Sequence, residues 1–242
     1  MIRTRTPLAA LALAALLLPV AAFADGGGKP APPTTGAPAW NTQAGTNMSK
    51  EDADKVKAVE LYTQAYREVD KAKQEIKDAH ELRSAAGTDP KAIKKADDKL
   101  ASATKRLEKA RDKFGEVTTL DASYADGWNM LGFTRRKTGD IKGAFDAYWK
   151  CLALKPEHFG AHEYMGEAYL EDGRLAEART ELTWLRKRGE PAAAEAANLD
   201  AAISTWVAAN PDAAAKAVIG AKGVSAPGEM VNSTPAPADS AR

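Results

Sequence analysis

Cysteine is almost absent from this sequence, which has only Cys151 among its 242 residues. A single cysteine cannot form an internal disulfide, so a hydrophobic core must hold the fold together. The chain also lacks an excess of either charge, because 34 basic side chains stand against 33 acidic ones. Nucleic acids and anionic membranes are bound through clustered basic residues, so this balance predicts no nucleic-acid partner and no attraction to an anionic membrane.

Recognisable catalytic patterns are missing as well. No glycine-rich phosphate loop follows a strand pattern, and no Ser-His-Asp set has a structural context, so we predict neither an enzyme nor a cofactor. His158 and His162 are four residues apart with Glu163 adjacent, but no third ligand stands at a usable spacing, and we predict no metal site. Cys151 falls at a small inward position of a helix and has no paired histidine, which predicts a buried apolar role.

Long apolar runs are confined to the N-terminus, where Leu8–Leu18 follows Arg3 and Arg5. This run is short for a membrane span, and Ala22-Phe23-Ala24 is a small-x-small cleavage site, so residues 1–24 are interpreted as a signal peptide. The alternative is an uncleaved anchor. Cleavage would leave 32 basic and 33 acidic side chains and no integral membrane segment. We therefore expect an exported protein, periplasmic or secreted.

Two segments lack the apolar side chains that a core needs. Residues 25–50 are rich in Gly, Pro, Thr and Ala, and residues 211–242 are rich in Ala, Pro, Ser and Gly. Such compositions cannot bury enough apolar surface to offset the entropy of ordering, so both are predicted to be disordered. Trp40 is the exception in the first segment, where a solvated aromatic is favoured over one that docks on the core or a partner. The folded part is therefore expected over residues 51–210.

A 34-residue repeat is present within the folded part. Residues 34 positions apart share a small, turn-forming or apolar character. These pairs are Leu131 and Met165, Gly132 and Gly166, Gly139 and Gly173, Ile141 and Leu175, Ala144 and Ala178, and Tyr148 and Leu182. Gly132 and Ala144 are small where the two helices of a hairpin would cross closely. Gly139 is placed where the first helix must end in a left-handed cap. Pro156 then closes the second helix.

These motifs resemble the tetratricopeptide repeat. The resemblance covers about residues 125–192, as two copies at 125–158 and 159–192, with His162 of the second copy standing where Trp128 stands in the first. It implies an all-α fold, a right-handed helical repeat array in which helical hairpins stack side by side over residues 123–210.

The preceding segment, residues 51–122, is predicted to be a stretched first hairpin of coiled-coil type. Apolar residues recur at steps of three and four on both arms, first at Val56, Val59, Tyr62, Tyr66, Val69 and Ile76, then at Ile93, Ala96, Leu100, Ala103, Leu107, Ala110, Phe114 and Val117. Gly87 can end the first helix, Asp89 can cap the second, and Pro90 fits its first turn. Each arm should be on the order of 45–50 Å long.

A last helix is expected from Pro191 to about Ala209. Its apolar face carries Leu199, Ile203, Trp206 and Val207. No second helix is expected to follow, which is typical of a capping helix that shields the end of a repeat array from solvent.

The tetratricopeptide resemblance implies a concave groove lined by the first helix of each hairpin. The groove residues would be Asp126, Asn129, Phe133, Arg136, Lys137, Glu163, Glu167, Leu170 and Glu171. The groove would be basic at one end and acidic toward the other, with Phe133 and Leu170 exposed between, and exposed aromatics are frequent binding anchors. The alternative is that Phe133 packs on a neighbouring helix, such as the inner end of the long arm. A chaperone-type carboxylate clamp is not expected, because Phe133 stands where its second Asn would be.

Two functions follow from these patterns. The first is an extracytoplasmic scaffold or adaptor that binds a protein, as a peptide or a helix, in the groove. The second is a structural assembly protein that forms a homo-oligomer through residues 51–120, although the long hairpin already offers each of its seams an internal partner.

Overall fold

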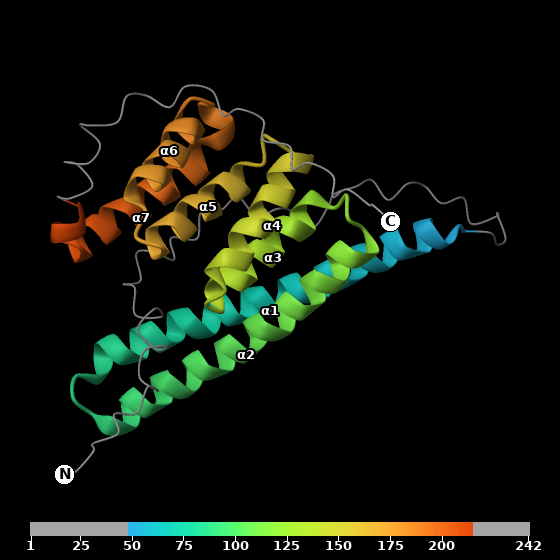
Figure 1. The fold of residues 1–242 in the computed structure, drawn as a ribbon. Helices are drawn as coiled ribbons and strands as arrows, with labels where there is room; N and C mark the ends of the chain where they lie inside the picture. Colours follow the sequence, from blue (N-terminus) through green and yellow to red (C-terminus); the bar gives the residue numbers. More distant parts are fainter. Residues whose placement is uncertain (1–47, 215–242) are drawn as a thin grey trace, which may run out of the picture.

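The computed structural model describes residues 48–214, and the predicted all-α fold is confirmed, because every regular element in this part of the chain is a helix (Figure 1). The elements are α1 (Lys50–Ala86), α2 (Pro90–Leu120), α3 (Ala125–Lys137), α4 (Ile141–Leu154), α5 (Phe159–Glu171), α6 (Leu175–Arg186), the 3-10 helix η3 (Glu190–Ala192) and α7 (Ala193–Ala209). The predicted signal peptide, Trp40 and nearly all of the two predicted tails lie outside the described residues.

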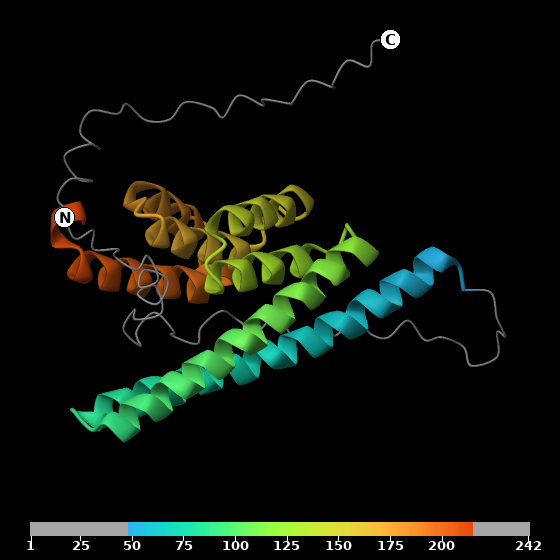
Figure 2. The same cartoon turned by 60° about the horizontal axis from the view of Figure 1, so that its bottom comes forward.

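α1 and α2 lie side by side as a long antiparallel hairpin that extends past the other helices (Figures 1 and 2). At 1.5 Å per residue, the 37 residues of α1 span about 56 Å and the 31 residues of α2 span about 47 Å. The predicted turn is confirmed: Gly87 has φ 53°, the Asp89 side chain accepts a hydrogen bond from the backbone N–H of Lys91, and Pro90 begins α2. Five ion pairs cross between the antiparallel arms, namely Lys57–Glu116, Arg106–Glu68, Arg106–Glu75, Lys99–Asp78 and Arg83–Asp97.

The seam between the two arms differs from the predicted one on α1. Val56 and Val59 are each 41% exposed, so their assignment to the seam is wrong. The buried residues of α1 instead alternate large side chains with alanine at steps of four and three, as Ala58, Tyr62, Ala65, Val69, Ala72, Ile76 and Ala79. Alanines in this pattern let the two backbones approach closely, and a search for large apolar residues alone passes over them. On α2 most of the predicted seam is buried, from Ala96 to Val117.

Two shorter hairpins follow, α3–α4 and α5–α6. Their turns are alike: Gly139 and Gly173 have φ of 88° and 74°, and the amide after each donates to the carbonyl five residues earlier. This is the left-handed cap that the sequence predicts at both glycines. α7 then packs against both α5 and α6, and α2 packs against α3 (Figure 2). One apolar core therefore runs from the long hairpin to α7.

Glycine is required where α3 and α4 cross. A Cβ on Gly132 would lie 2.6 Å from Cδ1 of Tyr148, whose side chain is fully buried and has no room to withdraw. Gly166, at the equivalent position of α5, faces a different element, because a Cβ there would lie 2.5 Å from Cδ2 of Leu199 on α7. The same residue type therefore serves two different close approaches.

Gly132→Ala is expected to destabilise the protein by about 1–3 kcal/mol, because the added methyl overpacks a filled core. The matched control is Gly115→Ala on α2, where an added Cβ meets nothing within 4 Å. Alanine should stabilise that helix by about 0.5–1 kcal/mol. Urea unfolding of both variants measures the two effects, and a Gly132→Ala variant as stable as the wild type would contradict a close crossing of α3 and α4.

The C-terminal end of the described chain departs from the sequence prediction in two details. Pro191 lies in η3 rather than in the last helix, and α7 begins at Ala193. Residues 211–214 are helical, and Ala214 is 7% exposed, so the predicted disordered tail begins too early. Pro211 ends α7 because it cannot continue the helix, yet it also suits the first turn of a new one, and sequence alone does not separate these roles.

None of the helices within residues 48–214 combines the length and the apolar character that a membrane-crossing segment needs.

Candidate functional site

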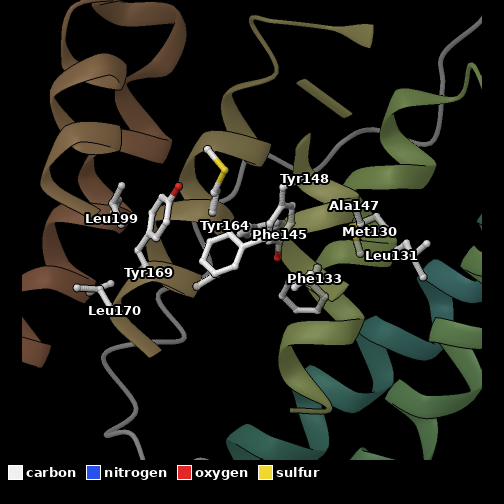
Figure 3. Close-up of a cluster of buried hydrophobic side chains, with 14 of the residues drawn as sticks. Met130, Leu131, Phe133, Phe145, Ala147, Tyr148, Tyr164, Tyr169, Leu170 and Leu199 are labelled. Atoms are coloured by element: carbon white, nitrogen blue, oxygen red, sulfur yellow. The ribbon is translucent and has the colours of Figure 1, made fainter. Parts of the chain in front are cut away.

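The predicted groove residues lie on α3 and α5. The prediction that the central part of the groove is exposed is wrong. Phe133 and Leu170 are only 4% and 5% exposed. The Phe133 ring packs against Tyr164, with centroids 5.1 Å apart (Figure 3). The Lys73 ammonium of α1 lies 5.4 Å from the centroid of the Phe133 ring. The alternative is therefore confirmed: Phe133 packs on the neighbouring helix beside the inner face of the long arm. Helical periodicity predicts that Phe133 lies on the concave side of α3. It does not predict that other side chains cover Phe133 there.

Two polar side chains are buried within this packed region. Asn129 and Glu163, 34 residues apart in sequence, are each 2% exposed. Asn198 of α7 donates a hydrogen bond to Oε1 of Glu163 at 3.2 Å. Burial, with the negative charge of Glu167 in second place, raises the pKa of Glu163 to about 9. The carboxyl group is therefore protonated and uncharged at neutral pH, which makes its burial tolerable.

The predicted basic and acidic ends of the groove are not separate, because Arg136 of α3 joins two glutamates of α5. Its Nη2 lies 2.5 Å from Oε2 of Glu167, and its Nη1 donates to Oε1 of Glu171 at 2.6 Å. The Arg136 side chain is 1% exposed. Burial lowers the pKa of its guanidinium, but the two carboxylates outweigh burial and raise that pKa well above its usual value. The cluster ties α3 to α5.

Lys137 lies beside this cluster, with its ammonium 3.8 Å from Oε1 of Glu171. Burial and the positive charge of Arg136 lower the pKa of Lys137, and the charge of Lys73 acts in the same direction. Positive charges are thus crowded at the C-terminal end of α3. The helix dipole favours positive charge at this end, but the neighbouring cations still repel one another.

Asp126, at the other end of α3, has a different role. Its Oδ1 accepts a hydrogen bond from Nε2 of His158 at 2.8 Å, and this bond lowers the pKa of the Asp126 carboxyl. Nδ1 of His158 accepts the backbone N–H of Ala161, so the proton resides on Nε2. His158 therefore caps α5 and joins it to α3, and both side chains are used in packing the two helices together.

A small open pocket lies between the C-terminal parts of α3, α5 and α7. Its walls consist of Arg136, Lys137, Glu167, Leu170, Glu171, Ala202, Thr205 and Trp206. Five of the nine predicted groove residues meet here, whereas Asp126, Asn129, Phe133 and Glu163 do not line it. The three residues from α7 were missed as site residues, because Trp206 was assigned only to the apolar face of a cap. Its spacing to Leu170, close to one repeat length, was the available signal.

The histidine pair considered for a metal is engaged elsewhere. Nδ1 of His162 lies 2.7 Å from Oε2 of Glu181, and its ring stacks on Trp184 with centroids 3.5 Å apart. His162 thus packs at the position where Trp128 stands in the first copy. Within residues 48–214 no three Cys, His, Asp or Glu side chains are grouped as a metal site would require.

The predicted apolar role of Cys151 is confirmed, because its side chain is fully buried in α4. Burial, followed by the charge of Asp126, raises the pKa of the thiol to about 12. A thiol that stays protonated in a packed core is a poor nucleophile.

A search of protein-family models and a search of curated proteins each find no match for this chain.

Proposed function

We propose that this chain is an exported helical-repeat protein of the tetratricopeptide type that acts as a scaffold, binding a short segment of another protein in the pocket between α3, α5 and α7. One observation carries the proposal. Five residues that the repeat pattern assigns to a concave binding face converge on the pocket, where they meet Trp206. A half-buried tryptophan beside charged groups is typical of a binding anchor rather than of a finished core.

Further support comes from the order of the elements. α3 and α5, the first helices of the two short hairpins, both reach the pocket, and α7 continues the same series. The leader-like residues 1–24 support export. Among the described residues, the titratable groups nearest the pocket are tied into ion pairs or buried, which favours binding over catalysis.

The alternative is self-assembly through the long hairpin. Its alanine seams are buried between α1 and α2 and offer nothing to a second copy. The observation in its favour is the exposure of Val56 and Val59 near the start of α1. Light scattering at two protein concentrations decides it: one monomeric mass at both concentrations rules assembly out.

Site-specific photo-crosslinking in the cells that produce the protein tests the pocket. A photoreactive amino acid at Thr205, on the pocket wall, is expected to capture a partner, and the same group at the exposed Lys142 of α4 is not. Trp206→Ala should weaken capture at least about tenfold, since truncation of an interface anchor commonly costs over 1 kcal/mol. The matched control is Trp149→Ala, which removes an aromatic that is 54% exposed on α4. Equal capture by the two tryptophan variants would contradict the proposal.

A further inference from the structure

The charges around the pocket do not cancel. Arg136 and Lys137 stand against Glu167 and Glu171, and the Lys73 ammonium adds a third positive charge beside Phe133. Glu163, the remaining acid in this region of α5, is held in its uncharged form by burial. At neutral pH the cluster therefore carries three positive charges and two negative ones, and it favours an incoming negative group.

An added anion could offer the cations a further hydrogen-bond acceptor and a further negative charge, beyond those of Glu167 and Glu171. Arg136 directs Nη1 and Nη2 toward Glu171 and Glu167 and also interacts with Tyr148, but no hydrogen-bond partner lies within reach of its buried Nε. An unpartnered buried N–H costs free energy that an additional acceptor would recover. Burial first, and the positive charge of Arg136 second, lower the pKa of Lys137 and so disfavour its ammonium form. A carboxylate placed in the pocket would relieve that repulsion.

The remaining walls are largely apolar. Leu170, Ala202 and Trp206 contribute hydrocarbon and aromatic surface next to the charged cluster. A ligand that matches both parts combines one negative group with an adjacent apolar one. Two neighbouring side chains of a peptide, one acidic and one apolar, provide this combination.

We propose that the pocket binds a peptide segment of the partner that carries an internal Asp or Glu beside a large apolar residue, with the acid at Arg136 and Lys137 and the apolar side chain against Leu170 and Trp206. This inference rests on the proposed function, which requires only that some peptide enters the pocket. The acid is a side chain rather than a chain terminus, because Asn129, which matches in type one of the two Asn positions of the family's carboxylate clamp, is 2% exposed and does not line the pocket.

An array of short peptides with both ends blocked, probed with the full chain, tests the inference. Peptides that pair Glu or Asp with Leu, Phe or Trp should be enriched among those that lose binding with Trp206→Ala. Fluorescence anisotropy of the best binder then compares Glu with Gln at the acidic position, and the Gln peptide should bind about tenfold more weakly, the loss of one charge-assisted hydrogen bond.

Protein variants provide the second arm. Lys137→Gln should weaken the acidic peptide about tenfold and leave the Gln peptide unaffected. Lys142→Gln, the same charge change at an exposed site on α4, should alter neither, and circular dichroism confirms that both variants fold. Peptides that need Trp206 but bind equally with Glu or Gln would overturn this inference while leaving the proposed function intact. An array with no peptide sensitive to Trp206→Ala would instead contradict the proposed function.

Discussion

Replacing Glu163 with glutamine is expected to stabilise the protein at neutral pH by several kcal/mol and to remove part of its alkaline sensitivity. Glutamine keeps the shape of the protonated carboxyl and can still bond to Asn198. The folded protein holds the pKa of Glu163 at about 9, against 4.5 for the free side chain, through burial first and through Glu167 and Glu195 next, whereas Asn198 and Arg136 oppose the shift. The folded state must therefore keep a proton that the unfolded chain releases.

The sign of the pH dependence follows from this proton. Between about pH 4.5 and pH 9 the native state binds more protons than the unfolded state at this site, so the free energy of unfolding falls as pH rises. At 1.36 kcal/mol per pKa unit, the cost near pH 7.5 reaches about 4 kcal/mol at most. Glutamine does not titrate, so the variant should avoid this loss.

Urea unfolding at intervals from about pH 5 to about pH 9 measures the effect. The wild type and Glu163→Gln should be similar in stability near pH 5 and diverge steadily above it. Glu60→Gln, at an exposed position of α1, is the matched control and should change stability by less than about 0.5 kcal/mol. Parallel curves for Glu163→Gln and the wild type would show that the carboxyl ionises without cost in the folded protein.

Replacing Arg136 with methionine is expected to destabilise the protein by about 3 kcal/mol. Methionine fills much of the same volume but leaves Glu167 and Glu171 without the cation that lies between them. Both carboxylates are mostly buried, with side chains 13% and 20% exposed, so water compensates them only in part. Loss of the bridge also releases α3 from α5 beside the pocket.

A rescue experiment separates the charge effect from a simple packing defect. Adding Glu167→Gln and Glu171→Gln to Arg136→Met removes the uncompensated charges and should restore more than half of the lost stability. The adjacent Arg135→Met is the matched control, since Arg135 bonds to the carbonyl of Gly143 from a side chain that is 31% exposed. It should cost about 1 kcal/mol or less. If the triple variant is no more stable than Arg136→Met, the ion cluster is not the cause.

The sequence predicts which helices carry the candidate site, but not which of their side chains are exposed there. A helical period and a 34-residue step identify Arg136, Lys137, Glu167, Leu170 and Glu171, and these do converge. The same rules could not show that Phe133 lies under Tyr164 and Lys73, because those contacts join residues from three helices. Nor could they assign Trp206 to the pocket, since its position depends on how α7 turns against α5.

Local chemistry therefore determined the helices and their ends. Gly87, Gly139 and Gly173 specify turns through left-handed backbone conformations that few other residues adopt, and Asp89 caps α2 through its side chain. The all-α course of the chain is therefore readable from sequence. Tertiary structure alone decided which face of each helix remains accessible, and with it the seam of α1, the protonation of Glu163 and the shape of the pocket. Burial and pKa depend on neighbours brought together from distant parts of the chain, and no local pattern encodes their distances.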